Sequence, residues 1–511
     1  MILFWIVFIP LAGGLLAWLA GTRGPLAGRK KDLSARFISL AALVLDTILV
    51  VFLFLGKPAG IAGGVWLARV NWSWLPALGI GFHLAVDGIS LLLVLLTVFL
   101  GIAAVISSWT EIESQVGFFH FNLMATLTGI IGVFVALDLF LFYVFWEIML
   151  VPMYFLIAMW GHEKRIKAAV KFFIFTQLSG LLMLAAILGL YFFHGRETGV
   201  YTFDYFKLLG THVDTGPATV LLLGFLAAFL VKLPAVPFHT WLPDAHTEAP
   251  TAGSVILAGL LLKTGGYGLL RFAVPLFPEA AMEIAPLAMS LGIIGILYGA
   301  VLAFAQTDIK RLVAYTSISH MGFVLLGVFV WNEKALQGVV IQMLCHGIST
   351  GALFILAGAL QERVHTREIE RLGGLWTVAP RMGGAWLFFA LASLGLPGMG
   401  NFIAEFLVLL GTYEVSVAMA TFAALGLVLS TVYAVWMAQK AFFGANREGW
   451  RIPDLETREL AVMTAMIVMI LWLGLYPQPY LDKARDGLST LQKNAAVSQA
   501  GGAIKVFGRE R

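Results

Sequence analysis

The sequence of 511 residues has little charge and almost no cysteine. Only 12% of its residues are charged and 60% are hydrophobic, whereas a soluble domain carries about 25% charged residues. This composition excludes an ordinary water-soluble enzyme, a disordered chain and a coiled-coil rod. The single cysteine, Cys345, excludes disulfide frameworks, thiolate metal sites and cysteine-ligated iron–sulfur clusters.

The basic residues also lack the clustering that is typical of nucleic-acid-binding proteins. The net charge is +4, and no basic run is longer than three residues, at 29–31. The first apolar segment, residues 1–20, has no positive charge before it, and basic residues follow it. We therefore expect a first spanning helix there rather than a cleaved signal peptide.

Long apolar runs predict about fourteen transmembrane helices. A spanning helix needs about 20 apolar residues, and the runs are continuous rather than alternating, which disfavours a membrane β-barrel. The predicted fold class is an all-α polytopic membrane protein. The helices are expected at about 1–20, 34–55, 88–108, 116–136, 138–160, 167–194, 217–241, 248–272, 283–306, 310–330, 335–361, 382–411, 416–443 and 459–478.

The distribution of Lys and Arg between the loops predicts the orientation. The loops on one side hold 19 of them, the interhelix loops on the other side hold six, and the tail after helix 14 holds six more. Cytoplasmic loops carry the excess of positive charge, so both termini are expected on the outer, periplasmic side. The polar segments 56–87 and 195–216 are predicted as extramembrane loops, and the polar tail after Tyr480 as surface-bound.

The same count isolates charged residues inside the predicted helices. Ionisable residues are costly in a bilayer, so those that occur there are candidate functional sites. Of 33 Lys and Arg residues, two remain after the loops and the tail are counted. The complete set inside helices comprises two lysines, three acids and two histidines: Lys232, Lys263, Glu147, Glu405, Asp46, His320 and His346.

Two segments resemble each other in a way that indicates an internal repeat. Residues 129–179 and 299–349 share seven identities at an offset of 170, and Leu-Pro pairs at 233–234 and 396–397 match at an offset of 163. About five helices separate equivalent positions, and an odd number inverts the second copy. Inverted repeats with broken helices are a transporter architecture. We therefore expect two inverted five-helix repeats, each with a broken helix, although a packing kink is the alternative explanation of each Leu-Pro pair.

This repeat divides the chain into four predicted parts. Residues 1–115 hold transmembrane helices 1–3, and residues 116–272 form the first repeat with helices 4–8. Residues 283–443 form the second, inverted repeat with helices 9–13. Residues 444–511 hold helix 14 and the polar tail.

The residue types in the first repeat suit proton transfer. Glu147 lies near the bilayer centre, where an opposite charge would allow it to ionise, and Lys232 is its natural partner. Breaking that pair would drive a proton off a buried lysine. Lys263 lies in a glycine-rich helix that permits close packing and some water. The alternatives are a neutral Glu147, a fixed salt bridge, and a Lys263 that only binds backbone carbonyls.

The second repeat supplies groups that could carry a proton onwards. Glu405 follows the second predicted break and could take a proton and release it outside. His320 and His346 can pass protons near neutral pH, although a buried histidine is often only a hydrogen-bonding residue. Asp46 lies outside both repeats, where we expect an interface or a helix-capping role.

Two further histidines flank the cytoplasmic end of helix 7. His239 and His246 could line a proton entrance. Together with Asp244 they superficially suggest a metal site, but no second cluster of ligands completes one, so we expect no metal.

Three long motifs resemble the signatures of the antiporter-like membrane subunits of respiratory complex I. They are KLPAVPFHTWLPDAHTEAPTAGS at 232–254, AQTDIKRLVAYTSISH at 305–320 and LPGMGNFIAE at 396–405. The likeness covers essentially the whole chain. The superfamily also includes subunits of multi-subunit cation/proton antiporters and of membrane-bound hydrogenases.

The resemblance implies a proton-translocating subunit of NADH:quinone oxidoreductase, in which electron transfer from NADH to quinone drives proton pumping. By this likeness Glu147 and Lys232 resemble the family's charged pair, Lys263 its central lysine, and Glu405 its exit acid. His320 and His346 resemble the connecting histidines. A cation/proton antiporter or hydrogenase subunit, and a purely structural membrane subunit, remain alternatives.

The resemblance also implies the partners and cofactors. We expect the other membrane subunits of complex I as partners, including the sister antiporter-like subunits L and N, in a multi-pass protein of the bacterial inner membrane. The sisters carry Lys at the position of Glu405, and this chain ends about 30 residues after helix 14, too soon for the long lateral helix of subunit L. NADH, flavin, iron–sulfur clusters and quinone are expected in other subunits, and no cofactor or nucleic acid is expected here.

Overall fold

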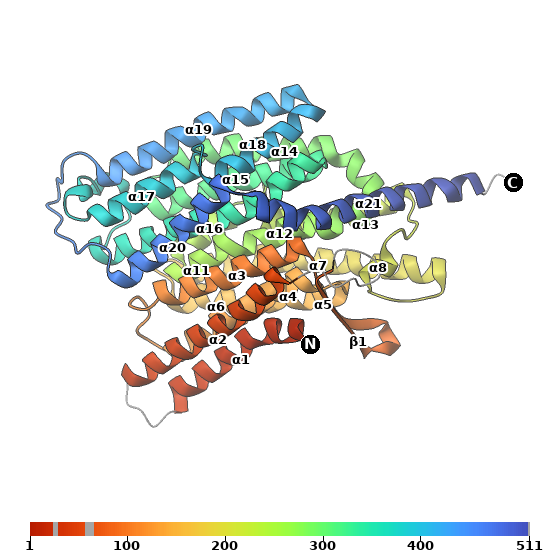
Figure 1. The fold of residues 1–511 in the computed structure, drawn as a ribbon, viewed down its shortest axis with the longest axis horizontal. Coiled ribbons are helices and arrows are strands. Elements are labelled where there is room, and N and C mark those ends of the chain that lie inside the picture. The colour runs from red at the N-terminus through yellow and green to blue at the C-terminus, as the bar shows by residue number, and fades with distance from the viewer. Residues whose placement is uncertain (24–28, 57–65, 509–511) are drawn as a thin grey trace.

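The computed structural model describes residues 1–23, 29–56 and 66–508. Within them, 13 helices are long and apolar enough to cross a membrane. Figure 1 shows these helices running in a common direction through one bundle, with the strands and the end of the last helix projecting at one end. The predicted class, a polytopic all-α membrane protein, is confirmed.

The first half of the bundle contains the helices up to the start of the second predicted repeat. They are α1 (Ile2–Arg23), α2 (Arg29–Leu55), α3 (Gly88–Ser107), α4 (Val116–Val135), α5 (Leu139–Ile148), α6 (Leu150–Trp160), α7 (Arg165–Thr198), α8 (Tyr205–Leu208), α9 (Thr215–Lys232) and α10 (Trp241–Glu248). A single helical stretch then follows, with two π-helical turns in it: α11 (Thr251–Ile256), η2 (Leu257–Leu261), α12 (Leu262–Gly268), η3 (Leu269–Ala273) and α13 (Val274–Leu276).

The second half contains the remaining long helices and two short 3₁₀ turns. They are α14 (Pro278–Phe304), α15 (Ile309–Val330), α16 (Glu333–Val364), η4 (Ile369–Arg371), η5 (Leu375–Thr377), α17 (Pro380–Ser393), α18 (Gly400–Val415), α19 (Val417–Phe442), α20 (Thr457–Leu475) and α21 (Gln478–Gly508). Two elements are enclosed by the others, the stretch 251–276 over its whole length and α16 over its apolar middle part. The centre of the molecule therefore lies where the two predicted repeats meet.

Each predicted broken helix is interrupted at its Leu-Pro pair. The first consists of α9 and α10, and α10 includes residues that the sequence divided between helices 7 and 8. The second consists of α17 and α18, each too short to be counted as a span. In both breaks an N–H reaches back five residues, from Ala235 to the Leu230 carbonyl (2.9 Å) and from Leu396 to the Leu391 carbonyl (3.2 Å). Proline supplies no N–H of its own, which ends the regular ladder at each place.

The same local structures recur at the offset of 170. Asp138 caps α5 by accepting backbone N–H groups, and Asp308 caps α15 in the same way. Each of these aspartates also forms an isolated backbone bridge with a later loop, Asp138 with Asp204 and Asp308 with Glu368. The helices α5 and α15 thus begin with equivalent turns. The boundaries of the four predicted parts of the chain stay predictions.

Two elements were not predicted. The segment expected as a loop at 56–87 contains a hairpin in which β1 (Ala68–Leu75) pairs antiparallel with β2 (Ile80–Val86) through η1 (Pro76–Leu78); its residues 57–65 lie outside the described chain. The tail expected to be a polar surface segment is the helix α21. It begins at Gln478 and packs on α3 and α16, and its last part extends beyond the bundle (Figure 1).

Candidate functional site

Glu147 and Lys232 lie close together but do not touch. Lys232 ends α9 and is fully buried, and its Nζ has no hydrogen-bond partner among the described residues. The ammonium lies 5.5 Å from the centre of the Trp146 ring and 5.4 Å from that of Phe172. Glu147, near the end of α5, interacts electrostatically with Lys232 and also approaches Gln177. No ion pair within 4.0 Å joins the two charges in the described residues, so a gap separates them.

Lys263 is held by the π-turn that precedes it. Its ammonium donates to the carbonyl of Ala258, inside η2, at 2.5 Å. A π-turn leaves carbonyls without their usual partner and is frequent at functional sites. The same ammonium lies 2.5 Å from Nδ1 of His346 on α16. Both residues are fully buried, so the predicted central lysine directly contacts one predicted histidine.

The second predicted histidine joins this contact to the predicted exit acid. The rings of His346 and His320 have their centres 5.6 Å apart, edge to face. Nδ1 of His320 lies 2.9 Å from Oε1 of Glu405, and its Nε2 lies 3.0 Å from the hydroxyl of Ser393. Glu405 is buried just beyond the second helix break. Four of the predicted residues therefore form one row, which we call the central row: Lys263, His346, His320 and Glu405.

Side chains that the sequence did not single out complete the polar contacts of the central row. Gln342 donates to Oε1 of Glu405 at 3.1 Å, and the hydroxyl of Tyr433 lies 3.2 Å from Nε2 of His320. If Nδ1 of His320 donates to the carboxylate, its Nε2 can accept from either hydroxyl. Gln342 lies one helical turn before His346 on α16, a spacing that could have identified it.

The two histidines of the predicted entrance occupy different places. His246 is fully buried, stacks on Phe354 with ring centres 4.5 Å apart, and interacts electrostatically with Lys263 and Lys310. Its ring nitrogens have no hydrogen-bond partner among the described residues. His239 lies instead against the ring of Tyr298. His246 is therefore the one that lies near the central row.

A buried lysine at the start of α15 was missed because the sequence count placed it in a loop. Lys310 is fully buried, and its ammonium lies 3.3 Å from Nε2 of His162. Burial, together with the charges of Lys310 and Arg367, lowers the pKa of His162 to about 3, so this imidazole is neutral and can accept from Lys310. Nearby, a cavity of about 360 Å³ is lined by charged side chains that include Glu248, Asp308 and Arg367.

Two other expectations need correction. Arg271, assigned to an outer loop, lies in η3 and is buried in an ion pair with Asp87. Asp46 lies in the middle of α2, where neither carboxylate oxygen has a hydrogen-bond partner among the described residues. It does not cap a helix, so that part of the prediction is wrong.

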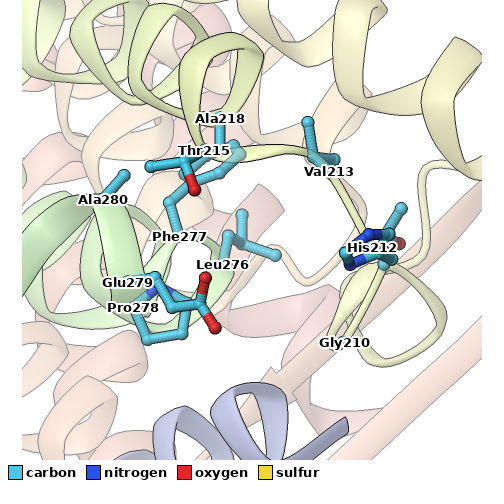
Figure 2. A pocket seen from close by; sticks show the side chains of 11 residues that line it. Gly210, His212, Val213, Thr215, Ala218, Leu276, Phe277, Pro278, Glu279 and Ala280 are labelled. Carbon is cyan, nitrogen blue, oxygen red and sulfur yellow. The ribbon is translucent and has the colours of Figure 1, made fainter. Parts of the chain in front are cut away.

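One small cavity lies apart from the predicted residues. A cavity of about 50 Å³ lies between the loop before α9 and the start of α14, with His212 and Glu279 on opposite sides of it (Figure 2). None of the predicted residues lines it. Within the part of the chain that the structure describes, no group of three His, Cys, Asp or Glu side chains could hold a metal ion.

The chain is similar to one protein family over most of its length. The family described as "NADH:quinone oxidoreductase/Mrp antiporter, TM" matches residues 136–431. Curated relatives named "NADH-quinone oxidoreductase subunit M" are 51% identical in Pseudomonas aeruginosa, over 98% of this chain and 100% of the relative, and 50% identical in Escherichia coli K12, over 96% and 98%.

Solved structures show the same fold. A chain of the respiratory complex I from Thermus thermophilus with bound NADH is 32% identical and superposes with a TM-score of 0.86, over 98% of this chain and 100% of that one. A chain of the Mrp complex from Dietzia sp. DQ12-45-1b has a TM-score of 0.82 at 20% identity, over 98% and 99%. At that lower identity the likeness establishes the fold alone.

Proposed function

The chain belongs to the family of NADH:quinone oxidoreductase and Mrp antiporter membrane subunits, and we propose how it works as a proton-translocating subunit in the position that subunit M occupies in its curated relatives. The observation that carries the proposal is the central row. It provides a buried line of titratable groups, each close to the next, from Lys263 to Glu405.

Protons move along the central row from the lysine to the acid. Lys263 donates to Nδ1 of His346, with the Ala258 carbonyl keeping the ammonium in place. The two imidazole centres lie 5.6 Å apart, and proton transfer between the rings requires a bridging water molecule or rotation of one ring. His320 then passes the proton to Oε1 of Glu405. Oε2 of Glu405 has no partner among the described residues and is the oxygen from which the proton leaves.

The Glu147–Lys232 pair drives this transfer electrostatically. Unscreened charges interact strongly in a low-dielectric interior, and a Cβ on Gly265 would lie 3.2 Å from Cβ of Lys232. The helix that carries Lys263 therefore packs directly against the base of Lys232. When the pair closes, the Lys232 charge moves towards Glu147, and Lys263 can hold its proton. When the pair opens, Lys263 gives its proton to His346.

Protons enter from the cytoplasmic side through His246. This imidazole interacts with Lys310 towards the charged cavity and with Lys263 towards the central row. Buried polar nitrogens without protein partners are ordinarily satisfied by internal water, which supports a hydrated entrance at His246. His239 lies beside it in sequence but faces Tyr298, so its contribution is indirect.

The remaining assignments follow from the family and the charge distribution. The chain acts as a subunit of a translocase, and electron transfer takes place in other subunits that bind NADH, flavin, iron–sulfur clusters and quinone. Its neighbours are other membrane subunits of the complex, including the sister subunits L and N. Both termini face the periplasm, because the loops at the opposite end carry most of the Lys and Arg residues.

A tagged form of the chain, purified from bacterial membranes, tests the proposal. We expect it to co-purify with NADH:quinone oxidoreductase activity and to support NADH-driven proton uptake in sealed vesicles. Purification with a cation/proton antiporter complex that lacks NADH oxidation would instead favour the alternative membership in this family.

A further inference from the structure

A second buried polar cluster lies beyond Lys263 on the same helical stretch. Tyr267 and Arg271 follow Lys263 at intervals of four residues, which places the three on one side of successive turns. The ammonium of Lys263 reaches back to Ala258, away from Tyr267. The other two side chains meet the start of α3, at the end of the bundle where the β-hairpin lies.

The polar atoms of this cluster are paired with one another. The Tyr267 hydroxyl donates to the Phe134 carbonyl at 2.9 Å, receives Nε–H of Arg271 at 3.2 Å, and lies 3.1 Å from the Ser90 hydroxyl. The guanidinium of Arg271 forms an ion pair with Asp87. Asp87 also accepts the backbone N–H of Ser90 at 2.9 Å, as the N-cap of α3.

Neighbouring elements enclose the cluster. Asp87 and Arg271 are each only 2% exposed, and the Trp66 ring covers the guanidinium at 5.3 Å. Helix α21 lies directly against the carboxylate, since a Cβ on Gly487 would be 3.1 Å from Oδ2 of Asp87. A Cβ on Gly88 would collide with the carbonyl of Lys483 in the same helix. The close packing leaves no room between α21 and the ion pair.

A gain in stability is by itself a weak reason for burying an ion pair at this place. Well-packed apolar residues of similar volume are often as stabilising as a buried pair, or more so. A guanidinium keeps its proton at any physiological pH, and a fixed arginine in a pore repels protons and cations. The hydroxyl hydrogen of Tyr267 points to a backbone carbonyl, which cannot pass a proton on. The fixed cation of Arg271, and the Tyr267 hydroxyl bonded to a carbonyl, thus both oppose proton transfer, and the Asp87 carboxylate is held by the ion pair.

We propose that Asp87, Ser90, Tyr267 and Arg271 form an outer seal, which blocks proton escape from Lys263 to the periplasm and leaves the central row as its outlet. The inference rests on the proposed function, because a seal matters only where Lys263 carries protons. It assigns Arg271 as a positioning residue that acts on the direction of transfer, without taking part in the transfer itself.

Passive proton conductance of the intact complex in proteoliposomes, driven by a potassium diffusion potential without NADH, tests the seal. The first variant is Asp87→Asn with Arg271→Met, which removes both charges while Asn retains the helix cap. We expect conductance to rise on the order of tenfold, which corresponds to about 1.4 kcal/mol of lost barrier. The second variant, Arg271→Lys, keeps the charge but can release a proton, and should give a smaller rise.

A second Arg–carboxylate ion pair provides the control. Arg363 pairs with Glu459 at 2.7 Å at the opposite end of the bundle, and both side chains are partly buried, 10% and 12% exposed. The double variant Arg363→Met with Glu459→Gln should keep wild-type conductance. Passive conductance is measured without NADH turnover, so the two proposals fail in different experiments. If the wild-type complex does not pump protons with NADH, the proposed function is wrong; the conductance of the variants tests the seal separately.

Three results would overturn the seal. The first is wild-type conductance in assembled complexes of both seal variants. The second is an equal rise in the control, which would indicate general loosening of the bundle. The third is failure of the double variant to assemble together with wild-type conductance of Arg271→Lys, which would make the ion pair purely structural.

Discussion

At the scale of single residues, the groups around each buried lysine determine whether it can exchange a proton or only move as a charge. Lys263 and Lys232 are both fully buried lysines. The Lys263 ammonium has two close polar partners, whereas the Lys232 ammonium lies near two aromatic rings and has no hydrogen-bond partner among the described residues. The first is therefore positioned to exchange a proton with His346. The second is positioned to move as a charge between its rings and Glu147.

Substituting Lys263 separates a proton carrier from a fixed charge. Lys263→Arg keeps the positive charge but does not release a proton at physiological pH, so NADH-driven proton uptake should fall to the level of Lys263→Met. Both variants should be compared in assembled complexes in sealed vesicles. Wild-type pumping by Lys263→Arg would show that this lysine is only a structural charge.

Glu405 should tolerate changes that keep a titratable group. Glu405→Asp or Glu405→Lys should retain more coupled turnover than Glu405→Ala, because the sister subunits are expected to carry Lys at this place. Glu405→Gln preserves size and can still bond to His320 and Gln342, but it cannot carry a proton, so it should behave like Glu405→Ala. Equal turnover in all four variants would remove the carboxyl from the pathway.

The residues of the central row were predictable, whereas Lys310 and Arg271 were not. Counting loop charges isolated Lys263, because no plausible boundary places it outside a helix. Lys310 and Arg271 lie near helix ends, where a shift of a few residues moves a charge from water into the interior. The spacing of Lys263, Tyr267 and Arg271 was the one available signal, and recognising it required knowing that the whole stretch is enclosed.

At the scale of elements, the helix breaks place the charged groups. Lys232 is the last residue of α9 and directly precedes its Leu-Pro pair, whereas Glu405 lies in the second turn of α18, the helix that follows the second break. Gly395 lies in the second break with φ of +77°, a conformation that glycine adopts far more readily than other residues. A Cβ there would lie 3.2 Å from Oε2 of Glu405.

Gly395→Ala should therefore impair both the break and its acid. The positive φ costs an alanine about 1–2 kcal/mol, and the new methyl group presses on the carboxyl. We expect reduced thermal stability of the complex and reduced pumping. Gly384→Ala, in the preceding helix α17, is the matched control, since nothing lies within 4 Å of its Cβ. Equal effects of the two substitutions would contradict the role given to the break.

Element prediction succeeded where the signal was a long apolar run and failed where the pattern was short or mixed. Helix α21 has buried residues at helical spacing on one face, but the polar residues between them interrupt any long apolar run, so the helix was not predicted. The buried residues are Tyr480, Ala484, Leu488, Leu491 and Ala495. The hairpin β1–β2 is largely exposed on one strand and therefore lacks a strong alternating pattern.

At the scale of the whole molecule, the central row occupies the most enclosed position. It is built on the helical stretch 251–276, on α15, α16 and α18; the stretch 251–276 is buried throughout and α16 is buried over its apolar middle part. α21 crosses from α3 to α16 and so ties the N-terminal helices to the second predicted repeat at the outer end. Charge transfer between the two halves therefore takes place at the centre, while the outer ends are held by a separate helix.

The orientation of the molecule can be tested with its own cysteine as a silent background. Cys345 is the only cysteine in the sequence and is fully buried, so a membrane-impermeant thiol reagent should label the wild-type chain weakly.

Ser73→Cys places an exposed thiol in β1, at the end predicted to face the periplasm, and Ala445→Cys places one in the loop after α19, at the opposite end. In intact cells stripped of the outer membrane, Ser73→Cys should be labelled and Ala445→Cys should not. Permeabilisation should expose the second site, because its loop is one of those whose Lys and Arg residues stay in the cytoplasm. The reverse pattern would invert the molecule, and the acid at the end of the central row would then release its protons to the cytoplasm.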